Sequence, residues 1–324
     1  MILTLHSLRR HGRYSLSALL LLSVLGVGSA MAAPPAVVVS IKPLHSLVTA
    51  VMRGIAPAEL LIGGAETPHS FALKPSQARS LQRADAVFWV GADLEGFLVK
   101  PLETLSRRAK VVALSKSVTL LPYRRDGMWN VAEDADDHTK HDQEHRHERG
   151  THDLHFWLDP VLVQTATETI VRTLSDIDNA NAARYRRNGD ALIARLAALN
   201  ERLRETLEPV RSVPYLVFHD AFQYFEKRYG LKAIGTVTLN PEHRPGARHL
   251  DAVQQRVARG DIRCVFREPQ FQPSMLNTIV ANRALRISVL DPLGATLASG
   301  PDTYFTILEN ITDSLSDCLE RRTG

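Results

Sequence analysis

The chain has 324 residues, 39 of them Lys or Arg and 35 Asp or Glu, which gives a formal net charge of +4. Three of the arginines and no acid lie in residues 1–32, so the remaining chain carries +4 − 3 = +1. The apparent basicity is therefore no argument for nucleic acid binding. The roughly 290 residues that follow are enough for two domains of ordinary size.

Residues 1–32 have the pattern of a secretory signal peptide. Arg9, Arg10 and Arg13 precede an apolar run, Leu16–Gly28, which is too short to span a bilayer. The sequence Ala-Met-Ala at positions 30–32 fits a small-residue cleavage site. No cysteine follows the apolar run, so the segment predicts a soluble exported protein without a lipid anchor. The alternative is a buried N-terminal helix.

Short apolar runs alternate with helical patterns in the rest of the chain. The runs are nearly continuous, which is typical of strands covered on both faces, and the alternation predicts an α/β fold with two parallel-sheet lobes. Strands are expected at Val37–Ile41, Glu59–Ile62, Ala86–Val90, Val111–Leu114, Tyr215–Phe218, Lys232–Val237, Cys264–Arg267 and Ile287–Leu290. Helices are expected between them at Pro75–Ala84, Gly246–Arg259 and Pro273–Leu285.

One longer helix is expected between the lobes, at Asn181–Leu207, where apolar residues recur near helical spacing until Pro209. It would run roughly 40 Å, long enough to brace two lobes. Gly189 is its weak point, costing about 1 kcal/mol relative to Ala. A packed surface helix is the alternative. The predicted organisation is a signal peptide (1–32), an N-terminal lobe (33–178), a linker helix (179–208) and a C-terminal lobe (209–324).

The segment Arg124–Thr151 contains eight acids, five bases and few apolar residues. Such a composition cannot bury enough surface to order itself, so we expect a disordered loop without core residues. Histidine-rich tracts often bind metal loosely, and in this setting we expect the loop to collect metal; an inert solvated loop is the alternative. Its histidines are His138, His141, His145 and His147.

The two cysteines of the chain, Cys264 and Cys318, form an even pair in a chain that is expected to be exported. That pattern predicts a disulfide, which would join a strand to the last helix. In the chain-entropy model a loop of this length contributes about 4 kcal/mol. A pair of metal ligands is the alternative, but two cysteines without a nearby third ligand make a poor zinc site.

Three histidines and one aspartate are predicted to lie where strand-like runs end: His69, His155, His219 and Asp291. Strand ends are where an open α/β sheet presents its ligands. Three imidazoles and a carboxylate suit a divalent transition metal, so the pattern predicts a zinc site between the two halves of the chain. Any one of these histidines alone could be a core residue or a helix cap.

We interpret Asp220 as a helix N-cap, and His45, His152, His243 and His249 as ordinary surface or supporting residues.

Six stretches make the chain resemble the ZnuA-type periplasmic zinc-binding subunits of bacterial ABC importers. The resemblance covers essentially all of the chain after the signal peptide. The stretches are PHSFALKPSQARSLQRADAVFWVGADLEGF (68–97), LHFWLDP (154–160), VFHDAFQYFEKRYGL (217–231), LNPEHRPGARHL (239–250), CVFREPQFQP (264–273) and LDPLG (290–294).

The resemblance implies two Rossmann-like lobes joined by one rigid long helix, with the metal in the cleft between them. It implies that His69, His155 and His219 are the ligands and that Asp291 is the carboxylate of the cleft. Pro68 stands where some zinc-binding members have Glu, so the fourth ligand would be Asp291 or water. The implied function is capture of Zn²⁺ in the periplasm by a monomer and delivery to a membrane permease with its cytoplasmic ATPase.

The ligand chemistry agrees with zinc. Zinc accepts a tetrahedron of imidazole nitrogens, whereas manganese prefers oxygen, and copper or nickel would also bind such a set. Two other functions are open: a metalloenzyme, and a surface adhesin or zinc buffer. The sequence has no HExxH motif for the first, and no repeat, wall anchor or lipid-box cysteine for the second. We therefore expect a binding protein and not an enzyme.

Overall fold

A computed structural model of the chain describes residues 33–124, 127–129, 151–238, 241, 245–260, 262–271 and 285–320. Residues 33–324 form one compact unit by their internal contacts. The predicted signal peptide, the four histidines of the acidic segment, His243 and nearly all of the predicted helix Pro273–Leu285 lie outside the described residues. The predicted domain boundaries stay a prediction.

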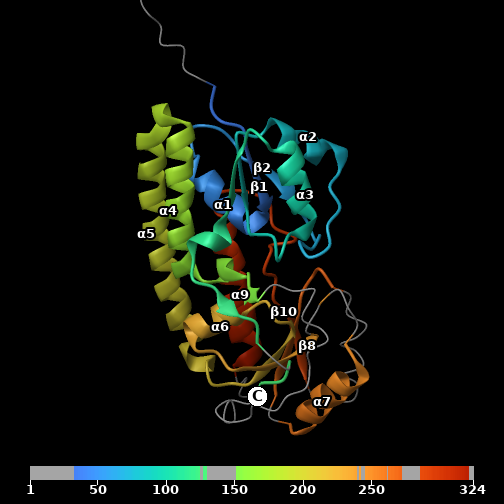
Figure 1. Cartoon of the computed structure of the whole chain (residues 1–324). Helices are drawn as coiled ribbons and strands as arrows, with labels where there is room; N and C mark the ends of the chain where they lie inside the picture. The colour runs from blue at the N-terminus through green and yellow to red at the C-terminus, as the bar shows by residue number, and fades with distance from the viewer. Residues whose placement is uncertain are drawn as a thin grey trace, which may run out of the picture. The chain divides into compact units, whose positions relative to one another are not determined.

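The first sheet is parallel and has the strand order β2-β1-β3-β4. Every residue of the central strands β1 and β3 is buried, as expected for a parallel sheet covered on both faces. Figure 1 shows this sheet with α1, α2 and α3 around it. Its strands are β1 (Val37–Ile41), β2 (Glu59–Ile62), β3 (Ala86–Trp89) and β4 (Lys110–Ala113).

The second sheet is also parallel, in the order β10-β9-β7-β8. The prediction of two parallel-sheet lobes is therefore confirmed, with strand ends displaced by one residue at most. The strands of this sheet are β7 (Tyr215–His219), β8 (Ala233–Thr238), β9 (Cys264–Arg267) and β10 (Arg286–Val289).

Several helices begin with proline in their first turn, where its missing N–H would be unpaired anyway. The helices are α1 (Lys42–Val51), α2 (Pro75–Arg83), α3 (Gly96–Leu105), α4 (Pro160–Ile177), α5 (Ala182–Leu207), α6 (Gln223–Tyr229), α7 (Ala247–Ala258) and α9 (Thr303–Leu319). Short 3-10 turns lie at Leu114–Ser117 (η1), Phe156–Leu158 (η2), Asn179–Asn181 (η3) and Glu208–Val210 (η4), and β5 (Leu121–Pro122) pairs antiparallel with β6 (His152–Asp153). No helix in the described ranges is long and apolar enough to cross a membrane.

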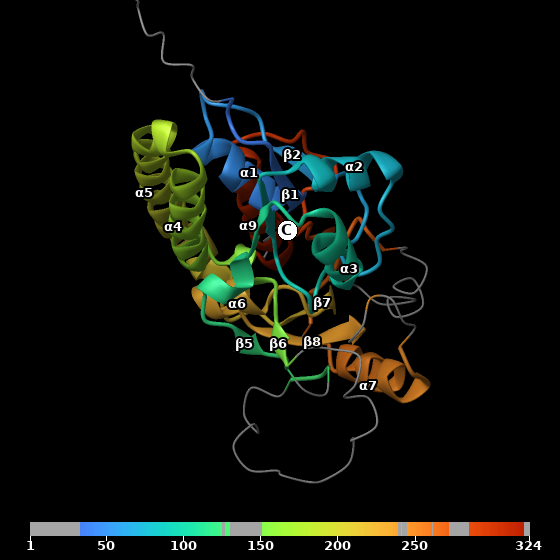
Figure 2. The same ribbon diagram turned by 45° about the horizontal axis from the view of Figure 1, so that its top comes forward.

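The predicted long helix is α5, and it lies side by side with α4 (Figures 1 and 2). Gly189 allows this pairing, because a Cβ at that position would lie 2.3 Å from Cγ2 of Val171 on α4. Helix α5 also contacts α1 and α9. The residue that looked like the weak point of the helix is therefore a place where the two helices pack closely.

The larger hydrophobic cluster of the described residues runs from the first sheet to the second. It contains residues of β1 and α1, of α5, and of β7 and α9. A smaller cluster covers the other face of the second sheet, around Phe218, Val237 and Val253. The start of α9 is tied to α1 by a hydrogen bond from the Tyr304 N–H to the Ser46 hydroxyl, 3.0 Å. The two lobes are therefore joined by α9 as well as by α5.

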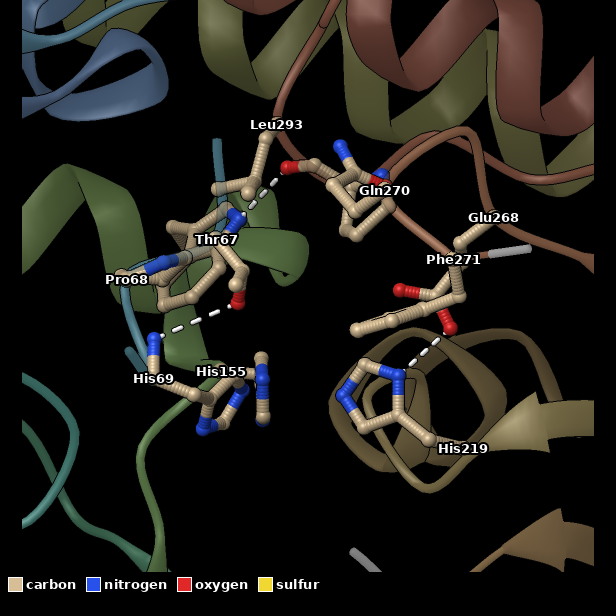
Figure 3. A pocket seen from close by; sticks show the side chains of 11 residues that line it. Thr67, Pro68, His69, His155, His219, Glu268, Gln270, Phe271 and Leu293 are labelled. Carbon is tan, nitrogen blue, oxygen red and sulfur yellow. Dashed lines mark hydrogen bonds and ion pairs between the residues drawn. The ribbon is translucent and has the colours of Figure 1, made fainter. Parts of the chain in front are cut away.

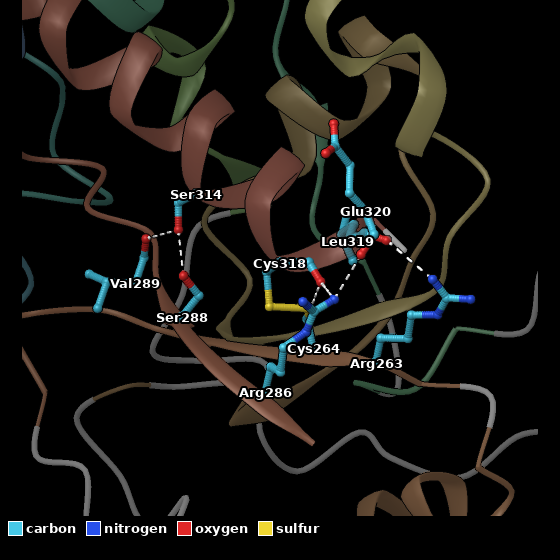
Figure 4. Close-up of a disulfide and its surroundings, with 9 residues drawn as sticks. All are labelled: Arg263, Cys264, Arg286, Ser288, Val289, Ser314, Cys318, Leu319 and Glu320. Carbon is cyan, nitrogen blue, oxygen red and sulfur yellow. Dashed lines mark hydrogen bonds between the residues drawn. A yellow bond between two sulfur atoms is a disulfide. The ribbon is translucent and has the colours of Figure 1, made fainter. Parts of the chain in front are cut away.

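The end of α9 is joined to the second sheet by the disulfide Cys264–Cys318, with a Cα–Cα distance of 6.1 Å (Figure 4). The predicted pairing is confirmed. Two arginines donate hydrogen bonds to the last carbonyl groups of the helix. Arg286 Nη2 donates to Cys318 O and, at 3.0 Å, to Glu320 O. Arg263 Nη1 donates to Leu319 O at 3.4 Å. Cations at a helix C-terminus pair with otherwise orphaned carbonyls and complement the helix dipole.

The start of the predicted disordered loop is ordered, so that part of the prediction is wrong. We call residues 121–124 and 127–129 the strap. Met128 bridges Gly235 on β8 antiparallel, the Thr236 N–H donates to Gly127 O at 2.7 Å, and the Trp129 N–H donates to Ile234 O at 2.8 Å. A Cβ on Gly235 would lie 2.6 Å from Met128 Sδ, so glycine is what permits this approach. Backbone pairing with an open sheet edge, which composition does not reveal, orders the segment.

Candidate metal centre

Three imidazoles converge between the two sheets. His69, His155 and His219 each offer one ring nitrogen, and these nitrogens all lie within 4.8 Å of one another. The ring centroids are 5.4 to 5.6 Å apart. His155 and His219 are both 4% exposed, and His69 is half-buried. The structure thus brings together the three histidines that the sequence singled out.

The three rings come from different kinds of backbone. His219 is the last residue of β7, as predicted. His69 instead lies in the turn between β2 and α2, and His155 lies between β6 and the 3-10 turn η2. The prediction that all three end strands is therefore wrong for these two. The apolar run Phe156–Leu158 has no hydrophobic period long enough to separate a strand from a turn.

Carboxylates orient two of the imidazoles. His155 Nδ1 lies 2.7 Å from Asp153 Oδ1, and His219 Nδ1 lies 2.5 Å from Glu268 Oε1. An Nδ1–H that donates to a carboxylate leaves the Nε2 lone pair for a metal. Nε2 of His219 is buried and has no hydrogen-bond partner among the described residues. Both rings therefore have the tautomer and the orientation that metal ligation requires.

The cluster lies in a small cavity of about 10 Å³, room for one ion or water-sized species (Figure 3). Apart from the histidines, its polar walls are Thr67, Glu268 and Gln270. Its remaining walls are apolar and keep the surroundings dry: Pro68, Trp157, Phe271, Pro292 and Leu293. A dry site of this size suits a dehydrated metal ion better than an organic ligand.

Asp291 is not part of this cluster of metal-ligating groups and does not line the cavity. Its carboxylate accepts hydrogen bonds from the N–H groups of Leu293 (3.1 Å), Gly294 (2.9 Å) and Ala295 (2.5 Å), and from Gln270 Nε2 (3.0 Å). It closes the turn after β10. Direct ligation by Asp291 stays a prediction from the sequence, and the turn is the role that its contacts describe.

A buried lysine of the first lobe holds the same turn. Lys42 Nζ donates to Gly294 O at 2.5 Å and to Leu297 O at 2.8 Å. Burial lowers the pKa of Lys42, and the negative charge of Asp291 acts in the opposite direction. Trp157 Nε1 also donates to Pro292 O, at 2.9 Å. Lys42 and Trp157 therefore hold the turn after β10, which borders the cavity.

The remaining sequence candidates lie outside the cluster. His45 Nε2 bonds to Ala58 O at 3.0 Å and His249 Nε2 to Thr236 O at 2.8 Å, while His152 lies exposed in β6. The interpretation of Asp220 as a helix cap is wrong, since Phe222 occupies that position in α6. Asp220 instead pairs with Arg124 of the strap.

Sequence reasoning missed Asp153, Glu268 and Gln270. Asp153 stands two residues before His155, in HDLH, and Glu268 directly follows β9. An acid beside a ligand histidine or at a strand end is a usable signal for a supporting carboxylate. Gln270 carries no such signal, because only the fold brings it to the cavity.

The fold and the cluster define a two-lobed α/β protein with a candidate three-imidazole site for a transition metal between parallel sheets. Residues 37–318 match the family model described as ZnuA, zinc-uptake complex component A, periplasmic, and the chain belongs to this family.

Named relatives agree with this assignment. The high-affinity zinc uptake system protein ZnuA of Brucella suis is 41% identical over 310 residues, covering 88% of this chain and 92% of the relative. The protein of the same name from Yersinia pestis is 34% identical over 311 residues, covering 94% and 96%.

Solved structures share the fold. A crystal structure of ZnuA superimposes with a TM-score of 0.74 at 24% identity, covering 89% of this chain and all (100%) of that one. The periplasmic zinc-binding protein TroA of Treponema pallidum gives a TM-score of 0.72 at 18% identity, with the same coverage.

Proposed function

We propose that this chain captures Zn²⁺ in the periplasm and delivers it to an ABC importer, with His69, His155 and His219 as the zinc ligands. The observation that carries the proposal is the convergence of three imidazole nitrogens within 4.8 Å in a small, largely apolar cavity. The names of the relatives, high-affinity zinc uptake proteins, support zinc as the cargo.

The positive charge of the zinc ion is balanced by carboxylates that do not bind the ion directly. Three neutral imidazoles leave the dication uncompensated, but the carboxylates of Asp153 and Glu268 lie directly behind two of them. The imidazole set also disfavours manganese, which prefers oxygen ligands. The arrangement therefore suits zinc without a carboxylate bound directly to the metal.

The partners follow from the class of protein. A zinc-uptake component of this family implies a membrane permease and a cytoplasmic ATPase. The apolar run in residues 16–28 supports export through a cleavable signal peptide. We infer a monomeric binding protein with no catalytic role, in which zinc is the cargo and not a cofactor, and we retain the acidic segment with His138, His141, His145 and His147 as a metal-collecting loop.

The test is zinc titration of residues 33–324 against a competing chelator. His69→Ala, His155→Ala and His219→Ala should each weaken binding by more than the 10–100-fold that is typical for an outer-shell partner. His249→Ala is the matched control, because His249 bonds to a backbone carbonyl outside the cluster. Near wild-type affinity in any of the three variants would remove that residue from the site.

A further inference from the structure

Two side chains that line the cavity carry a buried polar atom without a hydrogen-bond partner among the described residues. One is Nε2 of His219, which the proposed zinc ion would bind. The other is Oε1 of Gln270. A buried carbonyl oxygen without a donor costs about 1–3 kcal/mol, so it calls for a partner. Figure 3 shows Gln270 on the same loop as Glu268 and Phe271, above the histidines.

The orientation of the Gln270 amide is fixed by Asp291. A carboxylate can only accept, so the NH₂ end of the amide faces Asp291, at 3.0 Å from Nε2 to Oδ1. The oxygen must then point away from Asp291. Asp291 is itself held by three backbone N–H groups, so it cannot turn to accommodate the opposite amide orientation. The end of the amide that stays without a partner is therefore an acceptor oxygen and not a donor, on a residue that lines the cavity.

We propose that Gln270 is a positioning residue for the zinc site: its Oε1 accepts a hydrogen bond from a water molecule that is the fourth zinc ligand. This inference rests on the proposed function. Amide oxygen is not one of the usual zinc ligands, whereas metal-bound water is a strong hydrogen-bond donor that needs an acceptor. Asp291 then acts on the metal through Gln270 and this water.

The assignment also explains why the site can be tetrahedral without Asp291 or an acid at position 68. Three imidazoles and one water give four ligands. Three carboxylates lie behind these groups. Asp153 and Glu268 contact two of the imidazoles, and Asp291 contacts the amide of Gln270. His155, His219 and the water are then each oriented from behind.

The test compares Gln270→Met with Gln255→Met, a control on the exposed face of α7. Met keeps the length of the side chain but offers no comparable acceptor. Gln270→Met should bind zinc 10–100-fold more weakly, the range for an outer-shell partner, while the control binds as wild type. In the cobalt-loaded proteins, the visible absorption bands should shift in Gln270→Met and not in the control. The reason is that loss of the hydrogen bond to the metal-bound water changes the ligand field of the cobalt ion.

Unchanged zinc affinity and an unchanged cobalt spectrum in Gln270→Met would overturn the inference and leave the proposed function intact. A crystal structure of the zinc-loaded wild type gives an independent test, even if the variant does not fold. It should show a non-protein oxygen on zinc within hydrogen-bonding distance of Gln270 Oε1, and an Asp291 oxygen on zinc would refute this. If the wild type bound no zinc, the proposed function would fail together with the inference.

Discussion

The carboxylates of Asp153 and Glu268 do two things for the imidazoles that they contact. They hold Nδ1 as a donor, so that Nε2 is the free ligand atom, and they place negative charge within one ring of the metal position. A neutral amide can do the first but not the second. Substitution by the isosteric amide therefore separates orientation from charge.

For Glu268→Gln we expect zinc affinity to fall 10–100-fold with little change in the stability of the zinc-free protein. The amide oxygen can still accept from His219 Nδ1, so the loss reports the missing charge. Competition with a chelator measures the affinity. Glu309→Gln, at an exposed ion pair on α9, is the control. An affinity equal to wild type would show that the charge behind the imidazole is unimportant.

Glu95 is expected to make the stability of the folded protein depend on pH. Its Oε2 accepts from the N–H groups of Val90 (2.7 Å) and Gly91 (3.1 Å). Burial raises the pKa of Glu95 from 4.5 to about 7, although these hydrogen bonds oppose the shift. Between these values the folded protein keeps a proton that the unfolded chain has released. Stability therefore falls as pH rises from about 4.5 to about 7, by at most about 3 kcal/mol.

Glu95→Gln should remove this part of the pH dependence, because the amide keeps an acceptor and does not titrate. Urea denaturation of the zinc-free protein at pH 5 and pH 7.5 measures it. The difference in unfolding free energy between the two pH values should be smaller in Glu95→Gln than in wild type and unchanged in the exposed Glu103→Gln. An equal difference in all three proteins would contradict the assignment.

At the scale of elements, the strap links β6 to the edge strand β8 of the second sheet, a connection that composition concealed. Arg124 pairs with Asp220, the residue after the proposed ligand His219, and its Nη1 lies 2.7 Å from Glu226 Oε2. Its guanidinium also stacks on Trp129, 3.5 Å from the ring centre. Burial alone would lower the pKa of Arg124, but Glu226 and Asp220 together raise it. The arginine is thus a permanent charge that pairs two buried acids, one of which adjoins His219 in the sequence.

Two deletions should therefore differ. Removing residues 130–150 should leave the unfolding temperature and the tight zinc site unchanged. Removing residues 124–151 also removes Arg124 and leaves the buried acids Asp220 and Glu226 unpaired, which should lower the unfolding temperature measurably. Calorimetry on both proteins measures the temperature and the zinc binding. Equal unfolding temperatures would show that the strap contributes nothing to stability.

Each element was predictable to the extent that its signal is local. The buried strands were predictable almost to the residue, because continuous β-branched runs between turns have few other interpretations. The approach of the three histidines was predicted from the strand-end pattern and from the motifs of the family, although only His219 ends a strand. The strap and Gln270 were not predictable, since each depends on a partner about 20 to 110 residues away along the chain. Gly189 looks like a weak point in the sequence for the same reason, since Val171 on α4 is the neighbour that requires a glycine there. The turn role of Asp291 is local, because its carboxylate accepts from Leu293, Gly294 and Ala295.

At the scale of the whole molecule, the disulfide and the shared core hold the second sheet to α9. Replacing both cysteines by serine should lower the unfolding free energy by roughly 4 kcal/mol in the chain-entropy model. Zinc affinity should not change, because neither cysteine lines the cavity. Urea denaturation and chelator competition measure the two quantities. A large loss of zinc affinity in the folded variant would show that the disulfide reaches the site.

The shared core has a consequence for the rate at which the cargo exchanges. With one continuous apolar interior, and with Lys42 and Trp157 bonded across the site, separation of the lobes would break much of the fold. Release of the ion must then proceed by successive ligand exchange on a nearly fixed frame. Of the three proposed ligands, His69 has the greatest access to solvent and lies in a turn, so we expect its bond to zinc to break first. The dissociation rate is then set by the turn between β2 and α2, and a covalent crosslink between the lobes would leave it unchanged.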